Sequence, residues 1–468
     1  MRLSLVSLWV VTAILSLPIA TSAERSGSFL LDARLAAQMP PKADWALVVK
    51  DLVTGRETAS AGNALHDPLV PASLVKLFTA GAVLDHDERH GMLRMRTVVL
   101  FDGAIHEGTL DGNLYLVGDG NALLSTDDLR KVARTLAATG VRLVSGSIVA
   151  DDTIFDTRGL ERSRKGAGYA PAGALGLDLH TVALTVVPTE PGKPPKVTVE
   201  PPNDAVRFAV AARTASIESS SIKVDRLDDT AYRVSGNIAA GAKPVKQRFP
   251  LQEPAHYAAG VLKTALRQAG VEVRGKVKEG KAPATAKTLV KIDGPDPRKL
   301  LQNMDINSLN VVADNLLLFL GAQTFGTPGT REKGLKTVND FLSTLGLPAG
   351  EVAIADGSGL HRENRVTARY MAEYLVKVAQ KGWFGSFRDT LPRIGLDGTL
   401  RGMRYKNERF RVKSGRLEDA FALAGYGVDG NGREFAFSYI VNVPDGAVMD
   451  LERTGAEVMR YLGTEVLQ

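Results

Sequence analysis

The sequence predicts a mixed α+β fold, in which two nested inserted domains rich in β-strand interrupt an antiparallel sheet with flanking helices. Three observations support this prediction. A pair of apolar strands at residues 45–61 comes directly before an apolar helix that begins near residue 71. Close to the C-terminus, three further strands follow a run of helices. Between these two parts lie about 200 residues of short strands, turns and prolines.

The two ends of the chain supply the elements of the main domain. A linker and a short amphipathic helix at residues 24–44 precede the first strand, and residues 53–56 form its hairpin turn. Thr367 is a favourable N-cap for a later helix, and the final helix has too few basic residues for us to expect it on a membrane rather than on the sheet. The later elements are helices at residues 308–321, 334–345 and 367–382, strands at 408–413, 420–426 and 433–442, and an amphipathic helix at 449–467.

The inserted part divides into two units. Ser125 and the acidic residues after it predict the start of a helix. Residues 175–245 are rich in strands and punctuated by prolines, which predicts a small all-β module inside a larger unit, and residues 285–299 form a connection back to the main domain. The predicted domains are a signal peptide at residues 1–23, the main domain at 24–94 and 292–468, an inserted domain II at 95–174 and 246–291, and a small β domain III at 175–245 nested in domain II.

Length and composition limit the class of protein. The 468 residues allow two or three domains with a sizeable core. The sequence contains no cysteine, which excludes disulfides, thiol catalysis and a lipidated N-terminal cysteine. Its basic side chains are scattered and not interleaved with aromatic residues, so we expect no nucleic-acid partner.

The N-terminus has the pattern of a secretory signal peptide. Arg2 precedes an apolar run at residues 3–17, and small residues end at Ala23, where we expect cleavage. The run is short for a membrane span, although an uncleaved anchor remains an alternative. Cleavage would remove one charged side chain and lower the net charge of +6 to +5. We therefore expect an exported, periplasmic protein that is attracted to anionic envelope polymers or lipid surfaces. Peripheral membrane or cell-wall association and a homodimer are both compatible with the sequence.

A possible nucleophile and its base lie at the start of the apolar helix. Pro71 suits a helix entrance, and Ser73 and Lys76 are spaced to share one face of the first turn. A serine hydroxyl needs a neighbouring base to become a nucleophile, and a buried lysine can lose its charge and serve as that base. A second Ser-x-x-Lys at Ser220–Lys223 lies in an alternating strand pattern, where residues three apart point to opposite faces. We interpret that copy as structural.

Two further signals follow in the chain. Ser308-Leu309-Asn310 stands at a predicted helix entrance, and Lys413-Ser414-Gly415 ends a predicted strand. With Ser73 and Lys76, and in this order, they resemble the motif set of penicillin-binding proteins and serine β-lactamases. Over nearly the whole mature chain the sequence resembles class C low-molecular-mass penicillin-binding proteins, the D-alanyl-D-alanine carboxypeptidase/endopeptidase family. The other segments that carry the resemblance are Pro71–Ser73, Asp356–Leu360, Asn364–Thr367, Gly395–Leu400 and Leu423–Tyr426.

The resemblance implies the fold of the penicillin-binding proteins and serine β-lactamases. It also implies hydrolysis of the terminal D-Ala-D-Ala bond of peptidoglycan muropeptides and of D-alanyl cross-links. The reaction would pass through an acyl-Ser73 intermediate that β-lactam antibiotics such as penicillins would trap. No metal and no organic cofactor are implied.

The resemblance also implies a role for each motif residue. Ser73 would attack the carbonyl with Lys76 as its base, and Ser308 would relay a proton toward the leaving amine. Lys413 would keep the site positive, which lowers the pKa of Lys76 and attracts a substrate carboxylate, and Asn310 would hold Lys76 and a substrate amide. The predicted substrate-binding residues are Ser414, Gly415 and Arg416.

Three positions depart from the family pattern. Arg416 replaces a small hydroxyl residue, and its guanidinium could clamp a carboxylate or crowd the site. The backbone N–H groups of Arg416 and Ser73 would form the oxyanion hole. His361 stands where a serine is usual, and residues 118–123 lack the expected Gly-Gly-Asp-Pro.

Three alternatives compete with this hypothesis. A zinc-dependent peptidase needs clustered histidines, whereas the seven here are scattered, and the pair His86 and His90 is interpreted as part of a solvated helix end. A β-lactamase would need a dedicated deacylating group, and so long an insertion would be unusual for one. A peptidoglycan-binding scaffold or sensor with weak or no turnover remains open.

Overall fold

The computed structural model describes residues 32–91, 93–158, 160, 169–228, 230–444 and 451–464. The predicted signal peptide lies outside the described residues. Within the ranges described, no helix has the length and apolar character needed to cross a bilayer.

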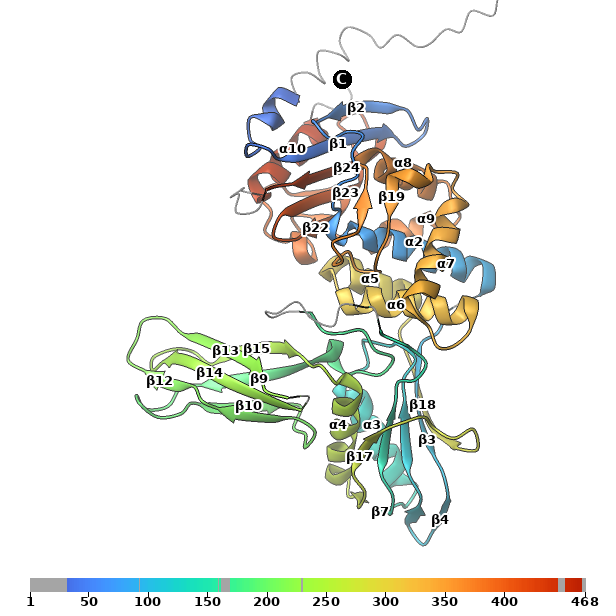
Figure 1. Cartoon of the computed structure of the whole chain (residues 1–468), viewed down its shortest axis with the longest axis vertical. Helices are drawn as coiled ribbons and strands as arrows, with labels where there is room; N and C mark the ends of the chain where they lie inside the picture. Colours follow the sequence, from blue (N-terminus) through green and yellow to red (C-terminus); the bar gives the residue numbers. More distant parts are fainter. Residues whose placement is uncertain are drawn as a thin grey trace, which may run out of the picture.

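The central element of the main domain is a six-stranded antiparallel sheet (Figure 1). The N-terminal hairpin joins the C-terminal strands, because β1 pairs with β24 along its whole length, from Asp44 opposite Asn442 to Asp51 opposite Phe435. In spatial order the strands are β2 (Glu57–Ala61), β1 (Asp44–Asp51), β24 (Glu434–Asn442), β23 (Ala420–Val428), β22 (Asn407–Arg416) and β21 (Arg393–Ile394). The two ends of the chain thus build one sheet, as the sequence predicts.

Helices cover both faces of this sheet. Alternate residues of β1 enter different cores: Ala46 packs with the large helical layer, whereas Leu47 packs with α10 (Leu451–Thr464) on the other face. The prediction that the final helix packs on the sheet is therefore confirmed. The helical layer contains α2 (Val75–His90), α5 (Pro297–Asn307), α6 (Asn310–Phe325), α7 (Arg331–Ser343), α8 (Ala368–Ala379) and α9 (Phe384–Thr390).

The helix α2 runs through the middle of the helical layer (Figure 1). Its residues from Val75 to Asp85 are all buried, as expected for a helix that is apolar on every side. A single 3-10 turn, η1 (Ala72–Leu74), leads into it. The short elements around it are η3 (Ala349–Glu351), β19 (Val352–Ala353), β20 (Arg365–Val366) and η4 (Gly398–Leu400).

The larger inserted unit packs two helices, α3 (Thr126–Ala138) and α4 (Pro254–Gln268), against a five-stranded sheet. Ser125 and Asp128 form a capping box at the start of α3, which confirms the predicted helix start. The segment predicted as a connection, residues 285–299, also contains a strand that was not expected: β18, a largely exposed edge strand that pairs with β3. The strands are β17 (Val277–Glu279), β8 (Ile148–Asp151), β6 (Leu114–Val117), β3 (Arg96–Phe101) and β18 (Lys287–Asp293), with a second sheet of β16 (Glu272–Val273), β7 (Leu143–Val144), β5 (Thr109–Asp111) and β4 (Ala104–His106).

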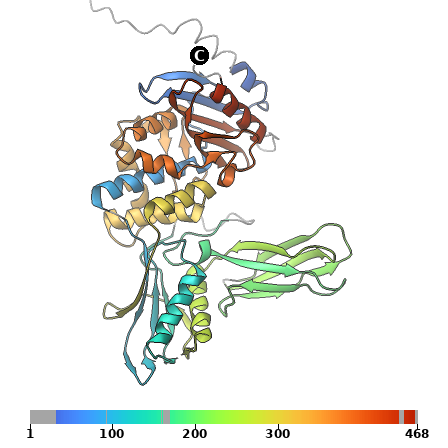
Figure 2. The same cartoon turned by 180° about the vertical axis from the view of Figure 1, so that it is seen from behind.

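The small β module projects sideways from the rest of the molecule (Figures 1 and 2). It has its own core, which includes Leu184, Val234 and Ile238. The second Ser-x-x-Lys ends in its strand β13, where Lys223 is exposed. Its elements are η2 (Asp178–His180), β9 (Thr181–Val187), β10 (Lys196–Glu200), β11 (Arg207–Val210), β12 (Arg213–Ala215), β13 (Ser221–Arg226), β14 (Ala231–Ala239) and β15 (Val245–Pro250), the last extending past the predicted domain end at residue 245.

Candidate active site

Ser73 and Lys76 meet at the N-terminus of α2. Ser73 lies in the 3-10 turn η1 and not in the first α-helical turn that the sequence predicts, and Lys76 is the second residue of α2. The two side chains still contact each other, with 3.0 Å between Lys76 Nζ and Ser73 Oγ. Lys76 is fully buried, whereas Ser73 is partly accessible. The hydroxyl can therefore be reached by a substrate while the amine is shielded from water.

The oxygens around Lys76 accommodate both of its charge states, because an ammonium can donate to all three of them and a neutral amine can donate to two. Its Nζ donates to Asn310 Oδ1 and to the carbonyl oxygen of Ser358, each at 2.6 Å, and neither oxygen carries a hydrogen. A neutral amine has two hydrogens and one lone pair. With both hydrogens used in this way, the lone pair is left for the hydrogen of the Ser73 hydroxyl.

Burial sets the pKa values of the two lysines. It lowers the pKa of Lys76 to about 8, although the carboxylates of Asp314, Asp356 and Asp305 oppose the shift. It also lowers the pKa of Lys413 to about 7, and the charge of Lys76 adds to that shift. Contrary to expectation, Lys413 does not cause the lowered pKa of Lys76; the cause is the removal of water from the amine.

Ser308 and Lys413 form a second pair. The distance from Lys413 Nζ to Ser308 Oγ is 3.0 Å, and Nζ also donates to the carbonyl oxygen of Ser414 at 2.7 Å. The sequence predicts that Ser308 begins a helix, and this is wrong. Ser308 joins α5 to α6 in a left-handed conformation with φ of 53°. This sharp turn makes Asn310 the first residue of α6, where its side chain reaches Lys76.

The end of β22 lies directly against the Ser73 turn. A Cβ added to Gly415 would stand 2.6 Å from the carbonyl oxygen of Pro71 and 3.1 Å from the backbone nitrogen of Ser73. Only glycine allows so close an approach. The Lys-Ser-Gly strand and the Ser73 turn, more than 300 positions apart in the chain, therefore share one site, as the resemblance requires.

The three predicted substrate-binding residues follow one another along this strand. The Ser414 hydroxyl is 3.2 Å from the hydroxyl of Thr399, a residue that the sequence analysis did not select. Thr399 belongs to the segment Gly395–Leu400 that carries the resemblance, so a signal for it was present. Arg416 is exposed at the strand end, and no carboxylate among the described residues is paired with it.

The segment Asp356–Leu360 positions Lys76 from the other side, a role that the sequence analysis also missed. Its Ser358 carbonyl accepts from Lys76, and a Cβ on Gly359, whose φ is 87°, would collide with the carbonyl oxygen of Ala72. Ala72 itself has φ of 48°, a strained value for alanine, directly before Ser73.

The Asp356 carboxylate holds this segment in shape. It accepts hydrogen bonds from the N–H groups of Gly359 and His361, both at 2.7 Å. The amide of Asn364 and the hydroxyl of Ser358 donate to it as well, at 2.9 and 3.2 Å. His361, one of the departures from the family pattern, uses its Nδ1 to accept from the Glu363 N–H and so stabilises the following turn.

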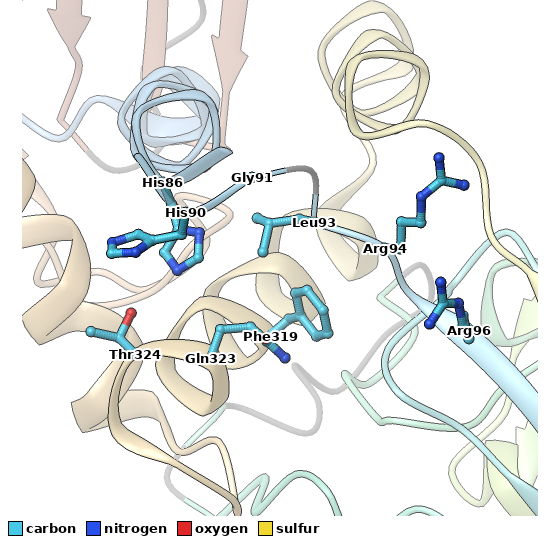
Figure 3. Close-up of a pocket in the computed structure, with 9 residues that line it drawn as sticks. All are labelled: His86, His90, Gly91, Leu93, Arg94, Arg96, Phe319, Gln323 and Thr324. Atoms are coloured by element: carbon cyan, nitrogen blue, oxygen red, sulfur yellow. The ribbon is translucent and has the colours of Figure 1, made fainter. Parts of the chain in front are cut away.

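His86 and His90 lie at the opposite end of α2 from Ser73. Their ring centroids are 4.6 Å apart, and they line a pocket of about 460 Å³ with Arg94, Arg96 and other residues (Figure 3). The interpretation of this segment as solvated is wrong for Asp85, which is buried and paired with Arg89 at 2.9 Å. Among the described residues, no three His, Cys, Asp or Glu side chains are grouped so that they could hold a metal ion.

Comparison with known proteins identifies the family. The sequence pattern of the D-Ala-D-Ala carboxypeptidase 3 (S13) family matches residues 30–460. The chain belongs to this family. Members are hydrolases with a peptidoglycan-related function and belong to the penicillin-binding proteins. The motif resemblance is therefore confirmed.

Two characterised relatives support the assignment. The chain is 32% identical over 428 residues to the D-alanyl-D-alanine carboxypeptidase of Actinomadura sp. (strain R39), covering 86% of this chain and 78% of that protein. It is 28% identical over 396 residues to the D-alanyl-D-alanine carboxypeptidase DacB of Haemophilus influenzae, covering 80% of each. This family member is accordingly a D-Ala-D-Ala carboxypeptidase.

A solved structure confirms the predicted fold. Penicillin binding protein 4 (dacB) from Haemophilus influenzae superimposes with a TM-score of 0.79 at 25% identity, covering 92% of this chain and 99% of that one. The same Haemophilus protein has also been crystallised in complex with a β-lactam. The sheet with its flanking helices and inserted units is thus the penicillin-binding fold.

Proposed function

We propose that this carboxypeptidase works through an acyl-Ser73 intermediate, that it also cleaves D-alanyl cross-links as an endopeptidase, and that penicillins acylate the same hydroxyl. One observation supports the mechanism above all. Lys76 donates two hydrogen bonds, to Asn310 and Ser358, and its Nζ lies 3.0 Å from the Ser73 hydroxyl oxygen. This is the arrangement that a general base for serine acylation needs.

Acylation follows from these contacts. Lys76 takes the Ser73 proton while Oγ forms a bond to the carbonyl carbon of the penultimate D-Ala. The backbone N–H groups of Ser73 and Arg416 stabilise the negative oxygen of the tetrahedral intermediate. When the C–N bond breaks, Ser308 passes a proton to the leaving amine and takes one from Lys413, and the proton that Lys76 accepted from Ser73 replaces the one that Lys413 gave up, so that Lys76 is neutral again. Water then attacks the ester and gives a proton to Lys76, which passes it to Ser73 Oγ as the C–O bond breaks and the shortened peptide leaves.

The end of β22 suits the carboxylate of the terminal D-Ala. Lys413 supplies an ammonium when protonated and donates to the Ser414 carbonyl oxygen, and the hydroxyls of Ser414 and Thr399 lie 3.2 Å apart. Arg416 extends beyond them with its five N–H donors unpaired by any described carboxylate. A planar guanidinium binds a carboxylate through two parallel hydrogen bonds, so we assign Arg416 to substrate recognition rather than to obstruction.

The substrate places the protein outside the cytoplasmic membrane, in agreement with the predicted export and periplasmic location. A net charge of about +5 after cleavage at Ala23 favours contact with anionic cell-wall polymers. Peripheral membrane association and a homodimer stay predictions.

Labelling with a fluorescent penicillin tests the acyl-enzyme. Wild type should become covalently labelled, and Ser73→Ala should not. The matched control is Ser220→Ala, which alters the second Ser-x-x-Lys and should leave labelling unchanged. Release of D-Ala from a pentapeptide and cleavage of a cross-linked muropeptide dimer, both followed by mass spectrometry, test the two peptidase activities. Labelling without either product would contradict the proposal and favour a binding scaffold or sensor.

A further inference from the structure

Asp305 is a buried carboxyl group that the proposed reaction does not use. It lies in the last turn of α5, three residues before Ser308, and its side chain has no exposed surface. The titratable groups that face it from neighbouring elements are Lys413 on β22, Lys76 on α2 and the Tyr374 phenol on α8. When it is ionised, its charge raises the pKa of both lysines.

The contacts of Thr390 bear on the protonation of Asp305. Its Oγ1 lies 2.7 Å from Asp305 Oδ2 and 2.8 Å from the carbonyl oxygen of Phe387. A threonine hydroxyl has one hydrogen, and a carbonyl oxygen can only accept. If Asp305 is ionised, the two oxygens share this one hydrogen; if Asp305 is protonated, Thr390 donates to Phe387 and accepts from the carboxyl group. Only the protonated form gives each contact a hydrogen of its own, so the geometry favours a protonated Asp305.

The second oxygen of Asp305 leads to the same conclusion. Oδ1 is buried and has no hydrogen-bond partner within the described part of the chain. A buried carboxylate with one oxygen unbonded is strongly disfavoured, whereas the carbonyl oxygen of a neutral acid tolerates this position better. Burial also raises the pKa of Asp305 to about 7, and the charge of Lys413 opposes that shift.

We propose that Asp305 is a positioning residue that carries a proton in the resting enzyme and sets the charge of the buried Lys76 and Lys413 pair. The inference rests on the proposed function of these two lysines. While Asp305 is neutral, nothing on α5 holds Lys76 as an ammonium, and its lone pair stays available to Ser73. When Asp305 ionises, its negative charge favours the ammonium form of both lysines. As an ammonium, Lys76 cannot accept the proton of Ser73.

The test is the pH dependence of acylation by a fluorescent penicillin, measured on the full mature chain. Asp305→Asn keeps the shape of the side chain and cannot ionise. Above about pH 7 the wild-type carboxyl group is charged and stabilises the Lys76 ammonium, and the variant lacks that charge, so the pKa of Lys76 should fall. The rising limb of the rate profile should move to lower pH by about one unit, the smaller end of the effect that a nearby charge has on a buried group. Asp296→Asn is the matched control, because Asp296 is an exposed N-cap of the same helix that asparagine also suits.

Infrared difference spectroscopy gives a readout that does not depend on turnover. Wild type minus Asp305→Asn should show the C=O band of a protonated carboxyl group at neutral pH, and the band should vanish in alkali. Thr390→Val should move that band to higher frequency because it removes the acceptor, and this variant also serves if Asp305→Asn fails to fold.

Three outcomes would contradict the protonation of Asp305, its effect on the lysines, or the proposed function. Absence of the carboxyl band would overturn the inference, whatever the activity. An unchanged rate profile in Asp305→Asn would reduce Asp305 to a structural role. An unlabelled wild type would refute the proposed function by itself, and the infrared band would still decide whether Asp305 carries its proton.

Discussion

Replacing Lys76 by alanine is the most direct test of how burial produces the base. Burial lowers the pKa of Lys76 from its ordinary 10.5 to about 8. At pH 7, a pKa of about 8 leaves roughly one lysine in ten neutral, whereas the ordinary value would leave about one in 3000. The fold therefore raises the population of free base by more than two orders of magnitude at that pH.

Lys76→Ala removes this base, and we expect acylation by a fluorescent penicillin to slow by about 10²- to 10⁴-fold. The wild-type rate should rise about fivefold from pH 7 to pH 8, as the neutral fraction of Lys76 grows, and level off above. Rapid-mixing fluorescence measures both quantities. Lys223→Ala, in the exposed second Ser-x-x-Lys, is the matched control and should keep the wild-type rate.

Two results would refute this reasoning. The first is a Lys76→Ala rate within about tenfold of wild type, since a general base in contact with the nucleophile contributes more than that. The second is a wild-type rate that does not change between about pH 6 and pH 9, because Lys76 would then not titrate in the range that its burial predicts.

Three further predictions follow from packing. Gly415→Ala should slow acylation about 10²-fold, because its methyl group would displace the Ser73 turn; Gly350→Ala, whose methyl group would meet nothing within 4 Å, is the control in the same labelling assay. Asp356→Asn should lower the free energy of unfolding by about 1.5–3 kcal/mol in urea, since it loses charge-assisted bonds to backbone N–H groups; no loss would contradict its structural role. Burial lowers the pKa of His180 to about 4, so the unfolded state takes up a proton first as the pH falls through 6.5, and wild type should lose about 2 kcal/mol between pH 7 and pH 5. A parallel urea titration of His180→Asn should lack that loss, and an equal loss in both proteins would exclude His180 as its source.

Features that depend on neighbouring residues were predicted well from the sequence. Ser125 and Thr367 cap their helices as expected, because the N-cap hydrogen bond joins residues three positions apart. The C-terminal strands and the second Ser-x-x-Lys also have local patterns: β23 and β24 are continuous apolar runs, as in strands buried on both faces, and β13 alternates.

Features that depend on long-range packing were missed or misplaced. The left-handed conformation of Ser308 follows from the way α5 packs before α6, and nothing in Ser-Leu-Asn itself requires it. The edge strand β18 has few buried residues to give it a pattern, so its pairing with β3 became visible only in the sheet. The role of the Ser358 carbonyl has no signature in the sequence, because every residue has a backbone carbonyl group.

The sequence by itself determined the chemical groups of this enzyme and their order: a serine and a lysine one turn apart, a Ser-x-Asn, and a Lys-Ser-Gly strand. These groups could be assigned from the sequence because a hydroxyl, an amine and an amide have the same reactive atoms in any fold. The tertiary structure alone decided which of these groups are charged. The pKa of an amine depends on how many atoms from distant segments exclude water around it, and Lys76 and Lys413 are enclosed by elements that lie far from each other along the chain.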